Sequence, residues 1–291
     1  MSTKKIRLAI STCPNDTFAF HGVLERKVDW LGVDFEIQLL DIQQLNDGLF
    51  RGEFDVAKAS FHAAALLADR TYVLPSGAAL GFGVGPLLLA ARPEFTPDSV
   101  TAKAGALTLC PGRHTTAALL YQLFYGDSVA GGKTRVEHAL FSEIMPKLQR
   151  AEADFGVCIH EGRFTWQAEG LFLVEDLGMR WEADTDSPLP LGGILASREL
   201  GEDLVGKIQA VVKSSVEYGL ANRAETLSTM KKYAQEFEDD VLYSHVDLYV
   251  NDWTVELGDV GERALSLLSQ KVREQGLQSP GGNDIQVWKP S

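Results

Sequence analysis

The feature that most constrains this chain is a long series of short apolar runs that alternate with amphipathic stretches. The runs have the length of β-strands, and we expect strands over Lys5–Ser11, Val33–Leu40, Asp55–Ser60, Val84–Arg92, Ala106–Cys110, Arg135–Phe141, Phe155–His160 and Leu171–Asp176. Such alternation is typical of an α/β protein with a mainly parallel sheet. We therefore predict the α/β fold class.

The amphipathic stretches between these runs predict helices. Asp41 begins one of them, and Gln44 follows three residues later, as in a capping box. Further helices are expected over Asp16–Lys27, Thr115–Tyr125 and Ser142–Ala151, and residues 201–276 are almost wholly helical in pattern.

Two segments interrupt the periodicity and predict the lobe boundaries. Residues 91–105 contain two prolines and read as a crossover, and residues 184–193 read as the return. We expect a larger discontinuous lobe of residues 1–92 plus 190–291, and a smaller inserted lobe of residues 93–189. Because open α/β sheets bind ligands at the carboxyl ends of their strands, the active site is expected in a cleft between the lobes.

An internal repeat supports two similarly built lobes. The sequence RGEFDVAKAS at residues 51–60 and the sequence RAEADFGVCIH at residues 150–160 share Arg, Glu and Asp in the same register. Each set lies where a predicted helix meets a predicted strand. A local device for ending a helix is the alternative explanation.

Charge and composition exclude several classes of partner. Lys and Arg number 27 against 40 Asp and Glu, so the net charge is −13. Such a surface repels nucleic acid and anionic membranes, whereas a small anion can still bind where local donors outweigh the overall field. The first apolar run is too short for a signal peptide and is interrupted by Arg7, so we expect a cytoplasmic protein.

The cysteines and histidines give no sign of a metal. The three cysteines lack C-x-x-C spacing, and no pair of histidines has the spacing of a zinc motif. The glycine-rich stretch GFGVGP lacks the spacing of a nucleotide-binding loop and precedes a strand. The residues therefore give no support for a metal site or for a nucleotide-binding loop.

His160 is the strongest catalytic candidate. It ends the otherwise apolar run FGVCIH, so its imidazole is expected at the edge of the core. Near neutral pH an imidazole there is suited to proton abstraction. The alternative is a histidine whose ring nitrogens are satisfied by nearby backbone groups.

Two further segments offer groups for an anionic substrate. Thr115 and Thr116 open a helix after a strand, where hydroxyls and backbone N–H groups favour negative charge. Plain capping by threonine is the alternative. Lys58, Ala59 and Ser60 end another strand, where Lys58 is suited to attract a carboxylate and Ser60 to hydrogen-bond it. For Lys58 a solvent-facing strand end is the alternative.

Six segments in order resemble one enzyme family. They are STCPNDTFAFHG, DVAKASFHAA, SGAALGFGVGP, PGRHTTA, CIHEGRFT and PLPLGGILASR, and they look like those of the 1,4-dihydroxy-6-naphthoate synthases of the futalosine route to menaquinone. The resemblance implies a two-lobed fold like the type II periplasmic solute-binding proteins, used as a lyase that acts on cyclic dehypoxanthine futalosine without a cofactor.

The resemblance also implies roles for individual residues. His160 matches the proposed general base, and the strand end at Lys58, Ala59 and Ser60 and the pair Thr115 and Thr116 match substrate contacts. Two alternatives remain open, namely a solute-binding protein without catalytic activity and the related chorismate dehydratase.

Overall fold

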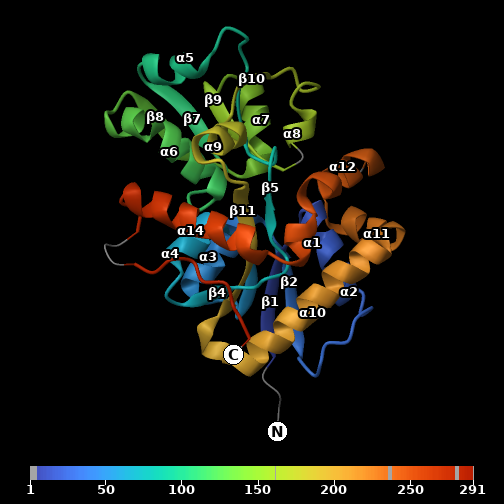
Figure 1. The fold of residues 1–291 in the computed structure, drawn as a ribbon. Helices are drawn as coiled ribbons and strands as arrows, with labels where there is room; N and C mark the ends of the chain where they lie inside the picture. Colours follow the sequence, from blue (N-terminus) through green and yellow to red (C-terminus); the bar gives the residue numbers. More distant parts are fainter. Residues whose placement is uncertain (1–4, 161, 235–237, 279–281, 291) are drawn as a thin grey trace. The chain divides into compact units, whose positions relative to one another are not determined.

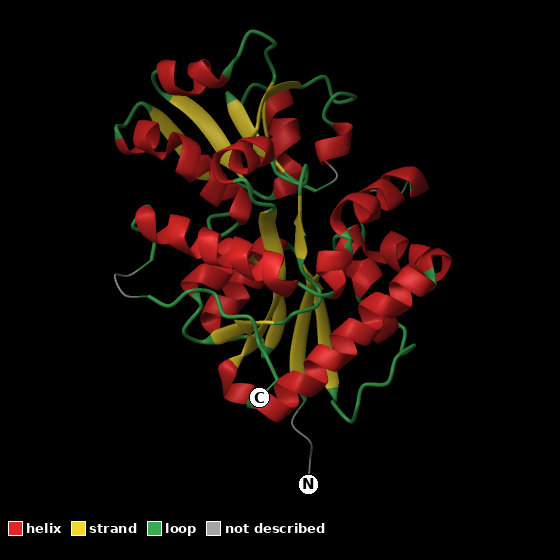
Figure 2. Cartoon of the chain, viewed as in Figure 1, coloured by secondary structure: helices red, strands yellow, loops and turns green. Residues whose placement is uncertain are grey.

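The computed structural model describes residues 5–160, 162–234, 238–278 and 282–290, and its chain divides into two compact units (Figure 1). Unit 1 contains Met1–Gly81 and Pro190–Ser291, and unit 2 contains Phe82–Leu189. In each unit helices pack against a β-sheet (Figure 2), which confirms the predicted α/β class. The expectation of a mainly parallel sheet is wrong, because both sheets mix parallel and antiparallel pairs.

The sheet of unit 1 has the strand order β2-β1-β3-β11-β4, with β5 also paired to β11. Its strands are β1 (Ile6–Ser11), β2 (Phe35–Leu40), β3 (Val56–Ser60), β4 (Thr71–Val73), β5 (Ala79–Gly81) and β11 (Leu189–Ser197). Strand β1 runs parallel to β2 and β3, whereas β11 runs antiparallel to β3 and β4. The carboxyl ends of β1 and β3 therefore lie at the same edge of the sheet.

The helices of unit 1 come from both ends of the chain. They are α1 (Pro14–Ala19), α2 (His21–Leu24), α3 (Ile42–Arg51), α4 (Phe61–Leu66), α10 (Glu202–Ala221), α11 (Arg223–Tyr233), α12 (Asp239–Tyr249), α13 (Asp252–Val255) and α14 (Gly258–Glu274), with a 3₁₀ turn at Arg198–Leu200. The apolar face of α10 packs on β1 and β3, and Val205, Ile208 and Val212 share a buried cluster with Leu8 and Val56.

The capping box at Asp41 is confirmed. The Asp41 side chain accepts a hydrogen bond from the backbone N–H of Gln43, and the Gln44 side chain accepts one from the backbone N–H of Asp41. The helix ends at Gly52, whose φ of 71° is the left-handed conformation that favours glycine at this position.

The single helix expected over Asp16–Lys27 is wrong, because the structure has two short helices there. The hydroxyl of Ser215 on α10 accepts a hydrogen bond from the N–H of Val23 and donates one to the carbonyl of Ala19. A side chain that enters the helical hydrogen-bond ladder in this way breaks the helix. The interruption at Phe20 therefore comes from tertiary packing.

The sheet of unit 2 has the order β10-β6-β9-β7-β8. Its strands are β6 (Leu87–Ala90), β7 (Ala106–Cys110), β8 (Thr134–His138), β9 (Phe155–Cys158) and β10 (Phe172–Asp176). Strand β7 runs parallel to β8 and β9, so their carboxyl ends lie at one edge.

The helices of unit 2 are α5 (Pro97–Ala102), α6 (Thr116–Ala130), α7 (Phe141–Gln149), α8 (Gly162–Thr165) and α9 (Leu177–Thr185). Of these, α7 packs on one face of the sheet of unit 2. Ile144 and Leu148 of α7 pack against Leu89 and Leu109 of the sheet.

The first lobe boundary differs from the expected one. Strand β6 pairs with β9 and β10, so the chain joins unit 2 at Phe82 and not at residue 93. The proline-containing segment that suggested a crossover forms α5 inside unit 2. Pro97 occupies the first turn of this helix, where its missing N–H costs nothing, and Thr96 forms a capping box with Ser99. The expected return segment likewise holds the end of α9 and the start of β11.

The internal repeat corresponds to the same local structure in both units. In unit 1 the carboxylate of Asp55 accepts the backbone N–H of Arg7 at 2.9 Å, and in unit 2 the carboxylate of Asp154 accepts that of Leu107 at 2.9 Å. Each Asp thus joins its own strand to the first parallel strand of its unit. The Arg and Glu that precede each Asp form an exposed ion pair at the end of a helix.

Residues 285–288 pack on the rest of unit 1. The backbone of Val73 exchanges hydrogen bonds with Gln286 and Trp288, and Ile285 is buried. In the part of the chain that the structure describes, none of the helices combines the length and the apolar character needed to cross a membrane.

Candidate functional site

In unit 1 the predicted site residues lie where β3 ends beside the turn that follows β1. The ammonium of Lys58 lies 2.7 Å from the Asp16 carboxylate and also donates to the carbonyl of Gly77 at 3.1 Å. Both side chains of the ion pair are only 5% exposed. The alternative of a solvent-facing lysine is therefore wrong.

Asp16 is the charged partner that sequence reasoning missed. Its carboxylate also accepts a hydrogen bond from the Asn15 side-chain amide at 3.1 Å, and it is hydrogen-bonded by Ser11. Burial raises the pKa of Asp16, and the Lys58 ammonium opposes that rise. In the sequence Asp16 only begins the helix expected over Asp16–Lys27, since spacing along the chain does not show that β3 brings a lysine to it.

Ser60 and Ala59 are held by neighbouring elements. Asn46 of α3 donates its side-chain amide to Ser60 Oγ at 3.1 Å and accepts the Ser60 backbone N–H at 3.0 Å. Ala59 is fully buried, and a Cβ at Gly192 of β11 would lie 2.5 Å from the Ala59 carbonyl oxygen. The backbone of this strand end is therefore fixed on both sides.

In unit 2 the turn after β7 presents the predicted threonine pair. Gly112 adopts a φ of 95°, which permits the tight turn. The Thr115 hydroxyl donates a hydrogen bond to the Gly112 carbonyl oxygen at 2.9 Å. Thr115 caps α6 by accepting the backbone N–H of Ala118 at 3.1 Å. Thr116 is buried in the first turn of the same helix. The capping interpretation of Thr115 is confirmed, and it leaves a helix N-terminus that favours an anion.

His160 follows β9 at the same edge of this sheet. Its φ is 56°, in the left-handed region that residues with a Cβ rarely adopt. Its ring lies 4.9 Å, centre to centre, from that of Phe141, and its side chain is half-buried. Four other described residues with a Cβ share this conformation, so it does not by itself assign a function; they are Arg26, Leu31, Ala151 and Asp186.

Arg163, three residues beyond His160, has protein partners. It donates to Asp176 at 2.7 Å and to the carbonyl of Gly85 at 2.6 Å. Asp176 also caps α9 through the backbone N–H groups of Gly178 and Met179. In this arrangement Arg163 joins α8, β10 and the glycine-rich segment before β6. Glu161, which belongs to the same motif, lies outside the described residues.

The three cysteines are buried. Burial raises the pKa of the Cys158 thiol to about 12 and that of Cys110 still further. Across residues 5–160, 162–234, 238–278 and 282–290, no three His, Cys, Asp or Glu side chains gather as they would around a metal ion.

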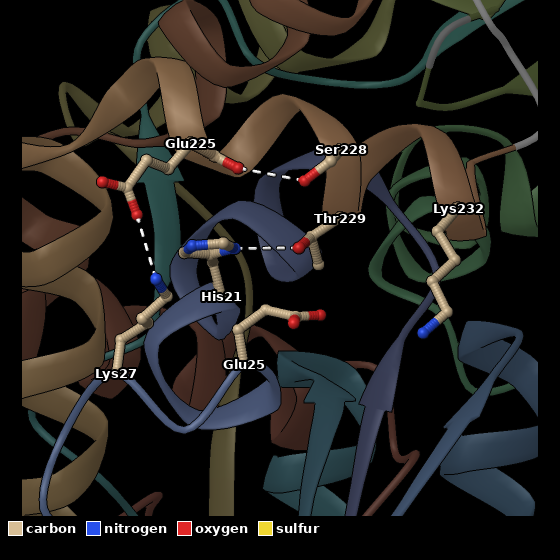
Figure 3. Close-up of a pocket in the computed structure, with 7 residues that line it drawn as sticks. All are labelled: His21, Glu25, Lys27, Glu225, Ser228, Thr229 and Lys232. Atoms are coloured by element: carbon tan, nitrogen blue, oxygen red, sulfur yellow. Dashed lines mark hydrogen bonds and ion pairs between the residues drawn. The ribbon is translucent and has the colours of Figure 1, made fainter.

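A separate polar pocket of about 450 Å³ lies in unit 1 between α2 and α11 (Figure 3). His21 is 3% exposed and its Nδ1 is 2.8 Å from the hydroxyl of Thr229. Lys27 pairs with Glu225 at the rim. Burial lowers the pKa of His21 and so favours the neutral imidazole.

Comparison with known proteins identifies the family. A family model described as menaquinone biosynthesis matches residues 6–274. The chain belongs to this family. It is 41% identical to 1,4-dihydroxy-6-naphthoate synthase of Thermus thermophilus, over 97% of this chain and 99% of the relative. The enzyme of the same name from Streptomyces coelicolor is 34% identical over 98% of each chain. The resemblance drawn from the six motifs is confirmed, and the family assignment makes the chain an enzyme.

Solved structures confirm the predicted fold. A protein from Archaeoglobus fulgidus, 30% identical, superposes with a TM-score of 0.85 over 95% of this chain and all of the other. The periplasmic aliphatic sulphonate binding protein of Escherichia coli has a TM-score of 0.66 at 14% identity, over all of this chain and 94% of that protein. The fold is thus that of periplasmic binding proteins, within a family of biosynthetic enzymes.

Proposed function

We propose that this enzyme converts cyclic dehypoxanthine futalosine to 1,4-dihydroxy-6-naphthoate and releases a sugar-derived fragment, as a carbon–carbon lyase of the futalosine route. The observation that carries the proposal is the near full-length identity of 41% to a relative named for this product. We further propose that it works in the cytoplasm and needs no metal or organic cofactor.

In this proposal His160 is the general base. Its left-handed backbone fixes the direction of the side chain, and Phe141 packs beside the ring. The imidazole removes a proton from the substrate, the bond to the sugar-derived fragment breaks, and the electrons form the aromatic naphthalene ring. General base catalysis of this kind contributes about 10²–10⁴-fold to the rate.

In the proposal two groups of residues, each described within its own unit, contact the substrate. The α6 N-terminus at Thr115 and Thr116 receives an anionic or hydroxylated part of the substrate. The strand end at Lys58, Ala59 and Ser60 receives another part through its backbone, which Asn46 and β11 hold in place.

The test compares wild type with His160→Asn and His160→Ala. Asparagine tolerates the left-handed backbone better than alanine, so His160→Asn removes the base with less added strain. We expect both variants to bind substrate and to form naphthoate at least about 10²-fold more slowly. Turnover near the wild-type rate in His160→Asn would exclude His160 as the base.

The same assay separates the alternative functions. Chorismate is offered in parallel with cyclic dehypoxanthine futalosine. Dehydration of chorismate without naphthoate formation would indicate the related dehydratase. Binding without turnover of either compound would indicate a solute-binding protein.

A further inference from the structure

The ion pair between Lys58 and Asp16 is a buried charged interaction in unit 1 that the proposed chemistry does not use. It lies at the sheet edge where α/β proteins bind ligands, yet neither side chain is more than 5% exposed. Burying two charges is costly, and a buried ion pair is often no more stabilising than an apolar pair of the same size. A contribution to the stability of the fold is therefore a weak explanation for the presence of this ion pair.

The Lys58 ammonium connects three segments that are distant in sequence. Through Asp16 it holds the turn after β1, in which Ser11 and Asn15 also hydrogen-bond the carboxylate. Through the carbonyl of Gly77 it holds the connection between β4 and β5. The β4–β5 connection is tightly placed as well, because a Cβ at Gly77 would lie 2.5 Å from Ile194.

We propose that Lys58 is a positioning residue for the reaction, whose ammonium fixes the turn at Cys13–Asp16 and the Gly77 connection in the shape that accepts the substrate. Its charge is satisfied by Asp16 and is not the group that binds the substrate anion. The inference rests on the proposed function and assigns Lys58 and Asp16 one shared task within it.

A double-mutant cycle tests the proposal. The variants are Lys58→Met, Asp16→Asn and the two combined, with Lys213→Met as the control. Lys213 also makes a 2.8 Å ion pair, with Glu256, but both partners are 40% or more exposed. We expect each single change to lower kcat/KM at least about tenfold, and the double variant to lose no more than the worse single variant, because the two residues act as one unit. The control keeps the wild-type value.

Direct binding of the substrate by Lys58 predicts a different pattern. In that case Asp16→Asn leaves the ammonium available and keeps kcat/KM, whereas Lys58→Met raises KM by the same factor with or without Asp16→Asn. Either result overturns the proposal.

The pH profile adds a readout that a purely structural role would not move. Protonation of Asp16 removes its charge, as Asp16→Asn does, and it costs no further activity where Lys58 is already absent. The acid limb of kcat/KM therefore includes the titration of the Asp16 carboxylate in wild type and in Lys213→Met, and this contribution is missing in Asp16→Asn and in Lys58→Met. An acid limb that is identical in wild type and Asp16→Asn contradicts the proposal.

Two measurements keep the proposal testable in difficult cases. Lys58→Met alone can fail to fold because it leaves Asp16 buried and unpaired. In that case the activity of the double variant is compared with that of Asp16→Asn. Equal activity supports the proposal, and much lower activity in the double variant contradicts it. Where wild type does not turn over the substrate, the proposed function fails. Amide hydrogen exchange at residues 12–17 and 74–78 then still reports whether Lys58 holds both segments: faster exchange in Lys58→Met supports this, and unchanged exchange overturns it.

Discussion

The two Asp residues of the internal repeat should each carry a stabilising contact, whereas the neighbouring Glu residues should not. Asp55 is 6% exposed and accepts hydrogen bonds from the backbone and the guanidinium of Arg7. Asp55→Ala leaves the Arg7 N–H without its acceptor, which costs about 1–3 kcal/mol, and breaks a partly exposed ion pair worth about 0–1 kcal/mol. The two contributions sum to about 1–4 kcal/mol, and we expect a loss in the middle of this range, about 2–3 kcal/mol in the free energy of unfolding.

The equivalent change in unit 2 should behave in the same way. Asp154 accepts the backbone N–H of Leu107 and pairs with Lys103. Burial alone would raise the pKa of Asp154, but the hydrogen bonds from Lys103 and Leu107 outweigh it and leave the pKa lowered. A carboxylate with a lowered folded pKa contributes stability above its unfolded pKa of about 3.9 and loses it as pH falls through the folded value. The cost of Asp154→Ala should therefore shrink below about pH 4.

The assay is thermal and urea unfolding at pH 7, with Glu53→Ala and Glu152→Ala as matched controls. A loss of about 2–3 kcal/mol corresponds to a fall in Tm of about 4–12 °C for chains of this size. The controls remove only exposed ion pairs and should leave Tm unchanged within error. If the Glu variants lose as much stability as the Asp variants, the contacts assigned to the repeat are wrong.

Further predictions concern packing, pH dependence and thiol reactivity. A Cβ at Gly85 would lie 2.2 Å from the Gly178 Cα, so Gly85→Ala should lower the free energy of unfolding, measured with urea, by about 3 kcal/mol or more. Gly126 lies within helix α6, and a Cβ there would have no contact closer than 3.4 Å. Gly126→Ala should therefore raise the free energy of unfolding by about 0.5–1 kcal/mol. An equal effect of the two changes would contradict the close approach. The lowered pKa of His21 means that the unfolded state takes up a proton below about pH 6.5 that the folded state resists, so stability falls from pH 7.5 to 5.5, and less steeply in His21→Gln. Unfolding curves at the two pH values check this, and identical slopes would refute it. Cys158, with its pKa raised to about 12, should react with iodoacetamide at pH 8 only after unfolding, as followed by mass spectrometry; rapid labelling of the native protein would show the thiol to be accessible.

The sequence pattern predicted the parts of the fold that depend on local order. Alternating apolar runs located β1, β3, β7 and β9, because strands in parallel sheets are buried on both faces and read as apolar runs. The capping box at Asp41 was also predictable, since its partners lie three residues apart. The repeat around Asp55 and Asp154 marked equivalent junctions, although only the structure shows which N–H groups they accept.

The remaining parts depend on contacts between distant segments. Strand β11 lies between β3 and β4, but its glycines and prolines suggested a crossover, and its antiparallel pairing is set by tertiary structure. The break between α1 and α2 is made by Ser215, almost two hundred residues away. The partner of Lys58 was unpredictable for the same reason, since Asp16 lies 42 positions earlier in the chain.

The most direct test of the central claim is turnover of cyclic dehypoxanthine futalosine by the purified protein and by His160→Asn, followed as formation of 1,4-dihydroxy-6-naphthoate. We predict product from the wild type, at least about 10²-fold less from the variant, and substrate binding retained in both. No product from a folded wild-type protein that binds the substrate would contradict the proposed lyase activity.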